Sequence, residues 1–271
     1  MDSRIVKVEG MRVSVRSSDG RGPAIMMIHG NSSSSVAFRH QLEGPLGAKL
    51  RLVTLDLPGH GGSDVAHDPA STYTLPGFAA AVATVARELE IDDQLFVGWS
   101  LGGHILMEAM NLLPRASGFC ILGAPPIRNP PNFDQAFLPN PVGRLLFQSA
   151  LSDMELHEWI DSYSTAGDVV PDELVAELRS SDGRMRPALG ASIAGAQYRD
   201  ETEIVANLPQ PLAVLHGEHD ALINLDYLRS LHIPTLWRGA VQVIGGAGHA
   251  PQWTSPSAFD SLLDAFVTDV A

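Results

Sequence analysis

The hydrophobic pattern of the chain alternates between short apolar runs and longer amphipathic stretches. The short runs are continuous, as in strands buried on both faces of a parallel sheet, and the longer stretches repeat with the helical period. Residues 4–8 and 11–15 alternate apolar and polar positions, which predicts an N-terminal hairpin. The pattern favours an α/β fold with a mainly parallel central sheet flanked by helices. The further predicted strands are residues 24–28, 50–55, 95–97, 117–122, 212–215 and 241–244, and the predicted helices are residues 36–42, 75–89, 101–113 and 258–270.

The alternation is interrupted between residues 125 and 209, where no segment has the pattern of a strand. Prolines are dense at the start of this segment, and helical signals follow. Ser152 and Glu155 form a capping-box pattern, Pro171 opens a second helix, and residues 185–197 suit a third. We therefore expect residues 125–209 to be a helical lid inserted in a core made of residues 1–124 and 210–271. Because the insertion separates two strands, it should lie over the strand ends.

A glycine–serine motif lies between a predicted strand and a predicted helix. It has the form Gly98-x-Ser100-x-Gly102, and this context makes it a candidate nucleophile elbow rather than an ordinary turn. The turn is so tight that glycine is favoured two residues before and after the serine, whose hydroxyl is pushed into the open. We predict that Ser100 is a catalytic nucleophile. The backbone N–H of Leu101, at the start of the helix, can donate to an oxyanion.

A serine nucleophile needs a base and an acid, and the ends of two later strands offer them. One predicted strand runs into Glu218 and Asp220, and the last one runs into His249. Both sets lie at carboxyl ends of strands, where open α/β sheets bind their ligands. The order Ser100, Asp220, His249 is that of the α/β-hydrolase triad, in which the histidine takes the serine proton and the acid orients the histidine. Glu218 is the alternative acid.

A second donor for the oxyanion is expected after the first parallel strand, where His29, Gly30 and Asn31 follow. The backbone N–H of Asn31 could face that of Leu101. Losing one such donor typically costs about 3 kcal/mol of transition-state stabilisation. We therefore predict an oxyanion hole made of Asn31 and Leu101.

Other side chains that could carry chemistry have simpler interpretations. His104, one helical turn after the predicted nucleophile, is expected to pack or to form a hydrogen bond behind the elbow. His216 and His219 are close in sequence to the predicted acid, but no second histidine pair at ligand spacing completes a zinc site, so we expect no metal and no cofactor. Asp56 is expected to cap a loop, and the glycine-rich residues 59–62 lack the lysine of a phosphate-binding loop.

Composition and charge narrow the range of partners. The 271 residues include 18 Lys and Arg against 31 Asp and Glu, a formal net charge of −13. This acidity argues against binding to nucleic acid or to an anionic membrane, and no run approaches the ~18 apolar residues of a membrane span. The single cysteine, Cys120, excludes an internal disulfide and lies in an apolar run typical of a buried core thiol rather than a nucleophile. Because no apolar signal segment follows Met1, we expect a cytoplasmic protein.

The chain resembles the α/β-hydrolases from end to end, and within them it is most similar to the metal-independent N-acyl-homoserine lactone lactonases. The resemblance implies that Ser100, Asp220 and His249 are the catalytic serine, acid and histidine, although the acid in this family is a glutamate. It also implies a substrate-binding residue at Trp159, where the family has a lid tyrosine. The segments that carry the resemblance are Met27-Ile28-His29-Gly30-Asn31-Ser32-Ser33-Ser34, Asp56-Leu57-Pro58-Gly59-His60-Gly61, Gly98-Trp99-Ser100-Leu101-Gly102-Gly103-His104 and Ala247-Gly248-His249-Ala250-Pro251.

The function that the resemblance implies is that of a cofactor-free serine hydrolase that opens the ring of a small-molecule lactone or ester. Trp159, Trp99 and Phe133 are candidate substrate contacts, and Phe137 and Trp253 are aromatic residues that could line the same acyl pocket. One alternative is a general carboxylesterase, or a hydrolase of carbon–carbon bonds with the same triad. Another is a ligand receptor that keeps the hydrolase fold and turns over poorly. The sequence does not specify an oligomeric state.

Overall fold

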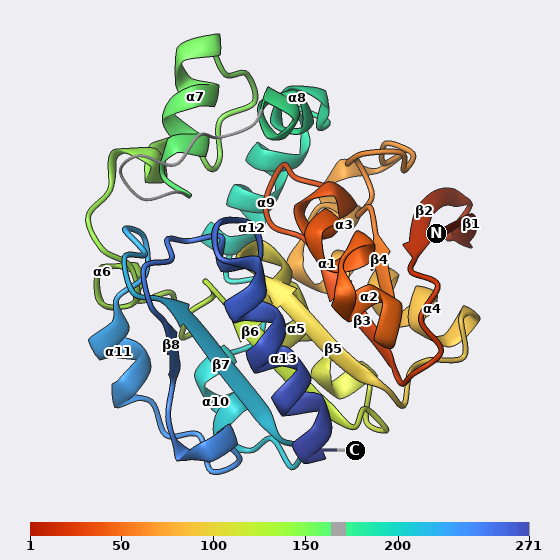
Figure 1. Cartoon of the computed structure of the whole chain (residues 1–271). Coiled ribbons are helices and arrows are strands. Elements are labelled where there is room, and N and C mark those ends of the chain that lie inside the picture. Colours follow the sequence, from red (N-terminus) through yellow and green to blue (C-terminus); the bar gives the residue numbers. More distant parts are fainter. Residues whose placement is uncertain (164–171, 271) are drawn as a thin grey trace.

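The computed structural model describes residues 1–163 and 172–270, so the helix start predicted at Pro171 lies outside the described residues (Figure 1). Eight strands of the described chain form one sheet in the order β1-β2-β4-β3-β5-β6-β7-β8. β1 pairs with β2 and β2 with β4 antiparallel, and all other pairs are parallel. The α/β fold with a mainly parallel sheet, including its N-terminal hairpin, is therefore confirmed. The strands are β1 (Asp2–Val8), β2 (Met11–Ser17), β3 (Ala24–Ile28), β4 (Arg51–Leu55), β5 (Leu95–Trp99), β6 (Gly118–Leu122), β7 (Leu212–Gly217) and β8 (Gln242–Ile244).

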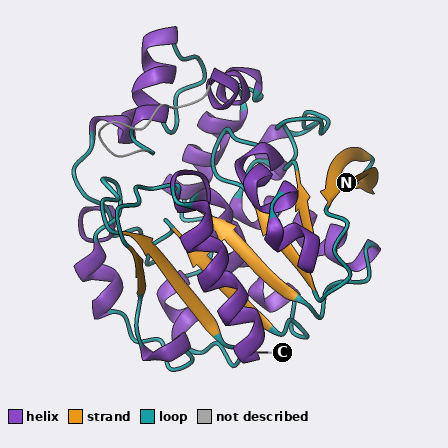
Figure 2. Cartoon of the chain, in the orientation of Figure 1, coloured by secondary structure: helices purple, strands orange, loops and turns teal. Residues whose placement is uncertain are grey.

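Helices cover both faces of the sheet because its central strands are apolar on both sides. Every residue of β3, β5, β6 and β7 is buried. Met26 and Ile28 of β3 pack in one core cluster with α4 and α5, whereas Ile25 and Met27 pack in a second cluster with α1, α2 and α13. The strands are accordingly enclosed between two helical layers (Figure 2). The helices of these layers are α1 (Arg39–Glu43), α2 (Pro45–Lys49), α4 (Leu75–Glu88), α5 (Leu101–Ala109), α11 (Leu225–Ser230) and α13 (Pro256–Val270).

The predicted helices are confirmed with changed ends. The helix predicted at 75–89 is α4, and the helix after the serine motif ends at Ala109 and continues as one 3-10 turn. The helix predicted at 36–42 divides into a 3-10 turn, Ser35–Phe38, and α1. α2 was not predicted because its five residues are too short to show a periodic pattern. The remaining short elements outside the insertion are α3 (Pro69–Thr72), η2 (Met110–Leu112), η4 (Trp237–Gly239) and α12 (Pro251–Thr254).

Between β6 and β7 the described residues form helices and loops and no named strand. α7 begins with the predicted capping box of Ser152 and Glu155, and α9 ends at Ala194 rather than at residue 197. α7 and α8 lie beyond the carboxyl ends of the strands (Figure 1). α10, which was not predicted, packs beside α5 on a face of the sheet, so its position contradicts the expectation that the whole insertion covers the strand ends. The elements of the insertion are α6 (Phe133–Ala136), η3 (Pro141–Arg144), α7 (Asp153–Asp161), α8 (Asp172–Ser180), α9 (Met185–Ala194) and α10 (Glu201–Ala206).

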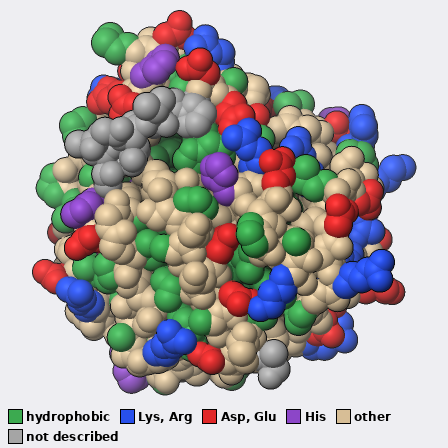
Figure 3. All heavy atoms as spheres, in the orientation of Figure 1, with side chains coloured by type: hydrophobic (Ala, Val, Ile, Leu, Met, Phe, Trp, Pro, Cys, Tyr) green, Lys and Arg blue, Asp and Glu red, His purple; other side chains and the backbone are tan. Residues whose placement is uncertain are grey.

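The outer surface carries charges of both signs. On the face shown in Figure 3, acidic and basic side chains are interspersed rather than gathered into one field. This face therefore lacks the concentrated positive stripe with which proteins bind nucleic acid. None of the described helices is long and apolar enough to cross a lipid bilayer.

Candidate active site

The serine motif forms the sharp strand-to-helix turn that the sequence predicts. Between β5 and α5, Ser100 has φ 53° and ψ −122°, a conformation that is unfavourable for any residue except glycine. A Cβ on Gly98 would collide with the backbone of Gly102, and a Cβ on Gly102 would collide with the backbone of Ile28. Only glycine fits on either side of the turn, which holds Ser100 at the carboxyl edge of the sheet.

The carboxyl ends of β7 and β8 bring Asp220 and His249 together. Nδ1 of His249 lies 2.9 Å from Oδ2 of Asp220, and both side chains are buried. The other oxygen of Asp220 accepts the backbone N–H groups of Leu222, at 2.8 Å, and Ile223, at 3.2 Å. Burial opposes ionisation of this carboxyl, but His249 and the backbone donor of Leu222 outweigh it and hold the pKa of Asp220 below its ordinary value. The carboxylate therefore receives Nδ1–H and leaves Nε2 of His249 as a proton acceptor.

Ser100 and His249 border the same cavity. No hydrogen bond joins the Ser100 hydroxyl to the imidazole within the described residues, and such catalytic bonds often tighten only when substrate binds. Gly123, with φ 59°, lies so close to the imidazole that a Cβ would be 2.8 Å from Cε1. Glu218, the alternative acid, is half exposed and accepts the backbone N–H of Gly246 at 2.8 Å. The carboxylate that contacts the histidine is therefore that of Asp220.

The two predicted oxyanion donors, Asn31 and Leu101, border the cavity next to Ser100. A Cβ on Gly30 would be 3.2 Å from the Cβ of Ser100, so the loop after β3 runs directly beside the serine. Neither the backbone N–H of Asn31 nor that of Leu101 has a hydrogen-bond acceptor in the described part of the chain. Two unpaired donors beside a serine are what an oxyanion hole requires.

The loop after β3, which carries Asn31, is held by a buried arginine that the sequence analysis missed. Nη1 of Arg186, in α9, donates to the Ser32 hydroxyl at 2.8 Å, and that hydroxyl donates to Oδ1 of Asn31 at 2.9 Å. Ser32 has φ 54°, a strained value that these bonds help to maintain. Nη2 of Arg186 donates to the carbonyl of Ser149 in the insertion, and burial lowers the pKa of the guanidinium. No sequence motif could have indicated this contact, because 154 residues separate the two partners.

The cavity has a volume of about 280 Å³ and mostly apolar walls. Trp159 and Phe133, two predicted substrate contacts, line it, as does Phe137. Trp99 does not: it lies behind the serine, where its Nε1 donates to the carbonyl of His249 at 2.9 Å. Trp253 packs instead against the ring of His40, at 4.6 Å between centroids.

The insertion contributes a second residue that the sequence analysis missed. The ring of Tyr163 lies 5.6 Å from that of His249 and 5.1 Å from that of Trp99, and it borders the cavity. Its hydroxyl accepts the Nε1–H of Trp159 at 2.6 Å, and burial raises the pKa of that hydroxyl. A tyrosine thus lies four residues after Trp159, at the same cavity and beside the ring of His249.

The remaining chemistry-bearing residues have the structural contacts that the sequence predicts. Asp56 caps a loop by accepting the backbone N–H groups of Ser35 and Gly62. Cys120 is buried, and burial raises the pKa of its thiol. His104 forms a hydrogen bond with the carboxyl group of Glu201, and it also lines the cavity. Among the described residues, no three His, Cys, Asp or Glu side chains form a group that could hold a metal ion.

The fold and this arrangement of Ser100, Asp220 and His249 define the class of protein. A model of the alpha/beta hydrolase family matches residues 25–261, and the chain belongs to this family. Its elbow between β5 and α5 is the feature by which members position a nucleophile.

More specific similarities support the resemblance seen in the sequence. The structure of the N-acyl homoserine lactonase AidH complexed with N-butanoyl homoserine is 34% identical, has a TM-score of 0.96, and covers 100% of this chain and 98% of that chain. The pimeloyl-(acyl-carrier protein) methyl ester esterase of Xanthomonas oryzae pv. oryzae is 27% identical over 258 residues, which are 93% of this chain and 97% of that protein. The esterase RhEst1 from Rhodococcus sp. ECU1013, 22% identical with a TM-score of 0.78 over 100% of both chains, has the same fold.

Proposed function

We propose that the chain is a serine hydrolase that opens the lactone ring of N-acyl-homoserine lactones. The observation that carries the proposal is that Ser100, the pair of Asp220 and His249, and the N–H groups of Asn31 and Leu101 all meet at an otherwise mostly apolar cavity. Such a lactone has a polar ring, which suits the catalytic residues and the two N–H groups. Its apolar acyl tail suits the apolar walls of the cavity. The 34% identity to AidH over the whole chain supports this substrate class.

The arrangement provides each step of the ring opening. Nε2 of His249 takes the proton of Ser100 as the serine oxygen attacks the ring carbonyl, and Asp220 stabilises the imidazolium that forms. The carbonyl oxygen becomes an oxyanion held by the two backbone N–H groups. The ring carbon–oxygen bond then breaks, and His249 gives its proton to the ring oxygen, which becomes the hydroxyl of the acyl-enzyme.

The same residues release the product. A water molecule gives a proton to His249 and attacks the ester carbonyl of the acyl-enzyme, and the oxyanion hole again holds the negative charge. The bond to the serine oxygen breaks as His249 returns the proton to Ser100. The product is N-acyl homoserine, and the enzyme regains its starting state without a cofactor.

The testing experiment is a hydrolysis panel followed by titration of the released acid. It compares N-butanoyl-, N-hexanoyl- and N-decanoyl-homoserine lactone with the methyl esters of the same acyl groups, each with and without a chelator. We expect steady turnover of the lactones at kcat/KM above about 10⁴ M⁻¹s⁻¹, unchanged by the chelator. Turnover of the methyl esters alone would instead favour a carboxylesterase, to which the 27% identity with the methyl ester esterase points. One burst of product without turnover would favour a receptor.

A further inference from the structure

Asn31, which offers one of the two unpaired N–H groups beside Ser100, lies in a strained turn. The turn spans four residues, since the N–H of Ser33 donates to the carbonyl of Gly30 at 3.3 Å. Ser32, its third residue, has φ 54°. Glycine or asparagine is favoured at a turn position with positive φ, so a serine there is strained. The direction of the Asn31 N–H therefore depends on contacts that keep this turn from relaxing.

The insertion holds the side chains of both central residues of the turn. Nδ2 of Asn31 donates to the carbonyl of Leu146 at 3.1 Å. The hydroxyl of Ser32 accepts Nη1–H of Arg186 at 2.8 Å and donates to Oδ1 of Asn31 at 2.9 Å. The amide of Asn31 is thus held on one side by the insertion directly and on the other side through Ser32 and Arg186. How the insertion is seated therefore determines how the turn lies beside the serine nucleophile.

Arg186 joins two further segments of the insertion to this turn. Nε donates to the carbonyl of Gln148, and Nη2 donates to the carbonyl of Ser149 at 2.9 Å, both in the segment before α7. Nη1 donates at 3.0 Å to the hydroxyl of Ser181, which directly follows α8. The guanidinium is a rigid planar group with fixed donor directions. A single side chain therefore sets the distance between the turn and these two parts of the insertion.

Arg186 is a buried cation without an acidic partner. It is 3% exposed, and none of the carboxylates that the structure describes forms an ion pair with it. Its side-chain acceptors are two carbonyls and two hydroxyls. A buried charge without a counter-ion is costly, and an apolar side chain would hold two packed segments together at a lower cost. The charge has a use at Ser32, because a hydrogen bond from an ionised donor is about twice as strong as a neutral one.

We propose that Arg186 is a positioning residue for the oxyanion hole. Through the hydroxyl of Ser32, it fixes the turn that aims the N–H of Asn31 at the carbonyl oxygen of the substrate. The insertion then completes the oxyanion hole in addition to lining the cavity. This inference rests on the serine mechanism of the proposed function and applies to any ester or lactone that Ser100 attacks. Because the oxyanion forms only after the attack, Arg186 should contribute to kcat and not to substrate binding.

The test breaks the connection at two points and measures kcat and KM separately. Arg186→Met keeps a long side chain but donates no hydrogen bond, and Ser32→Ala removes the hydroxyl between Arg186 and Asn31. For N-hexanoyl-homoserine lactone, kcat should fall about 10²-fold in Arg186→Met, which misplaces a donor of the oxyanion hole. In Ser32→Ala it should fall about tenfold, the usual effect of losing one hydrogen bond to a charged group. KM should not change in either variant.

A double variant tests whether Arg186 acts through Ser32. If it does, removing the Ser32 hydroxyl should have little further effect once the guanidinium is gone, because the two residues belong to one connection. The kcat of the double variant should then equal that of Arg186→Met. Losses that multiply would show that the two residues act independently, and the inference would be wrong.

An oxyanion analogue supplies a readout that loss of packing does not change. The probe is a hexyl trifluoromethyl ketone, whose carbonyl carbon bonds to the oxygen of Ser100 while the serine proton passes to His249. The ketone oxygen becomes an oxyanion and occupies the same position as that of the transition state. Its inhibition constant should therefore rise in each variant by the factor by which kcat/KM falls.

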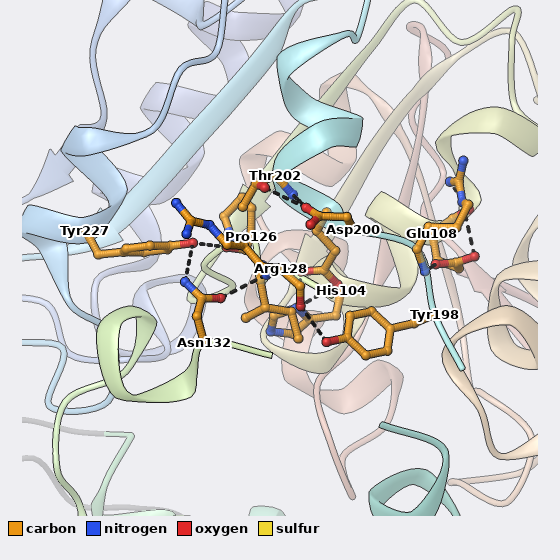
Figure 4. A network of polar contacts seen from close by, with 12 residues as sticks. His104, Glu108, Pro126, Arg128, Asn132, Tyr198, Asp200, Thr202 and Tyr227 are labelled. Atoms are coloured by element: carbon orange, nitrogen blue, oxygen red, sulfur yellow. Dashed lines mark hydrogen bonds and ion pairs between the residues drawn. The ribbon is translucent and has the colours of Figure 1, made fainter. Parts of the chain in front are cut away.

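Arg199→Met is the matched control. Arg199 also lies in the insertion and attaches it to the core, but all of its side-chain hydrogen bonds are to Met107 and Glu108. Figure 4 shows Glu108 in the polar network on that side of the molecule. Arg199→Met should lower the temperature of thermal unfolding and leave kcat and the inhibition constant unchanged. An equal loss of kcat in this control would show that any loosening of the insertion has the same effect, and would overturn the inference.

The outcomes separate this inference from the proposed function. An unchanged kcat in folded Arg186→Met, or an inhibition constant that does not follow kcat/KM, overturns the inference. Where thermal unfolding shows that Arg186→Met does not fold, Ser32→Ala decides by the same two criteria. Turnover of methyl hexanoate without turnover of the lactone overturns the proposed substrate, while the ester and the ketone still test Arg186. If neither substrate is turned over, the inhibition constant of the ketone decides alone.

Discussion

Two histidines that border the cavity, His249 and His104, each hold Nδ1 against a buried carboxylate, and the two pairs differ in their surroundings. In each pair, Nδ1 lies 2.9 Å from a carboxylate oxygen. Asp220 accepts two further backbone N–H groups, from Leu222 and Ile223, whereas Glu201 accepts one, from Ile127. The negative charge is therefore better solvated by the protein in the Asp220 pair than in the Glu201 pair.

The pKa values of the two carboxyls shift in opposite directions. Burial opposes ionisation at both carboxyls, but the pKa of Asp220 is lowered by His249 and the backbone of Leu222, whereas that of Glu201 is raised. The Asp220 pair leaves Nε2 of its histidine as a base beside Ser100. Nε2 of His104, four residues after Ser100, makes no hydrogen bond within the described residues.

The largest effect is expected when the nucleophile that the Asp220 pair serves is removed. Ser100→Ala should lower kcat by about 10⁵-fold or more, because the base then has no hydroxyl to activate. Steady-state hydrolysis of N-hexanoyl-homoserine lactone measures this loss, and circular dichroism checks the fold. A serine-directed phosphonate should label Ser100 alone. Substantial residual activity, or labelling of another serine, would mean that the nucleophile lies elsewhere.

A smaller loss is expected when the carboxylate of the first pair is neutralised. Asp220→Asn should lower kcat by about 10⁴-fold, because the amide favours the wrong tautomer of His249. Glu218→Gln is the matched control at the same strand end and should remain close to wild type, since Glu218 contacts Gly246 and not the histidine. Kinetics of both variants decide the assignment, and a larger loss in Glu218→Gln would show that the wrong carboxylate has been chosen.

The sequence predicts the Asp220 pair because local rules determine it. Ser100, Asp220 and His249 each follow a strand of the parallel part of the sheet. Because parallel strands end at one edge of a sheet, the three residues meet there although they are far apart along the chain. Glycines beside the serine provided a second local signal. The geometry of this part of the site therefore followed from strand ends and turns.

The Glu201 pair could not be predicted because nothing local joins its members. His104 and Glu201 are 97 residues apart, and α10, on which Glu201 lies, is too short to show a helical period. The contact of Arg186 with Ser32 is also set by tertiary packing alone. Tyr163 was missed for another reason, because it lies beyond the end of α7, four residues after Trp159, and only the packing decides which ring meets His249.

A third prediction asks on which side of the cavity the acyl tail lies. Phe133 packs on Phe137, next to the Glu201 pair, whereas Trp159 bonds to Tyr163 beside the Asp220 pair. Because each buried methylene contributes about 0.8 kcal/mol, Phe133→Ala should weaken an N-decanoyl lactone about tenfold more than an N-butanoyl lactone. Trp159→Ala should affect both lengths alike. KM measured over the chain-length series gives the answer, and the reverse pattern would place the tail beside Tyr163.

The smallest expected effect is a difference in how the free energy of unfolding depends on pH. It tests directly whether the pKa values of Asp220 and Glu201 shift in opposite directions. The folded pKa of Asp220 lies below its ordinary value of 3.8, so its contribution is present above that pH and is lost as pH falls through the folded pKa. The folded pKa of Glu201 lies above its ordinary value of 4.5, so its contribution is complete below pH 4.5 and is lost as pH rises through the folded pKa.

Urea unfolding at a series of pH values measures both contributions. The difference in free energy of unfolding between wild type and Asp220→Asn should decrease toward acid pH. The difference between wild type and Glu201→Gln should decrease toward neutral pH. His249 and His216 face Asp220, and His104 and Glu108 face Glu201, so the same series on His104→Phe shows how much of the second trend depends on the imidazole. Parallel trends in the two carboxylate variants would mean that the protein solvates both charges equally.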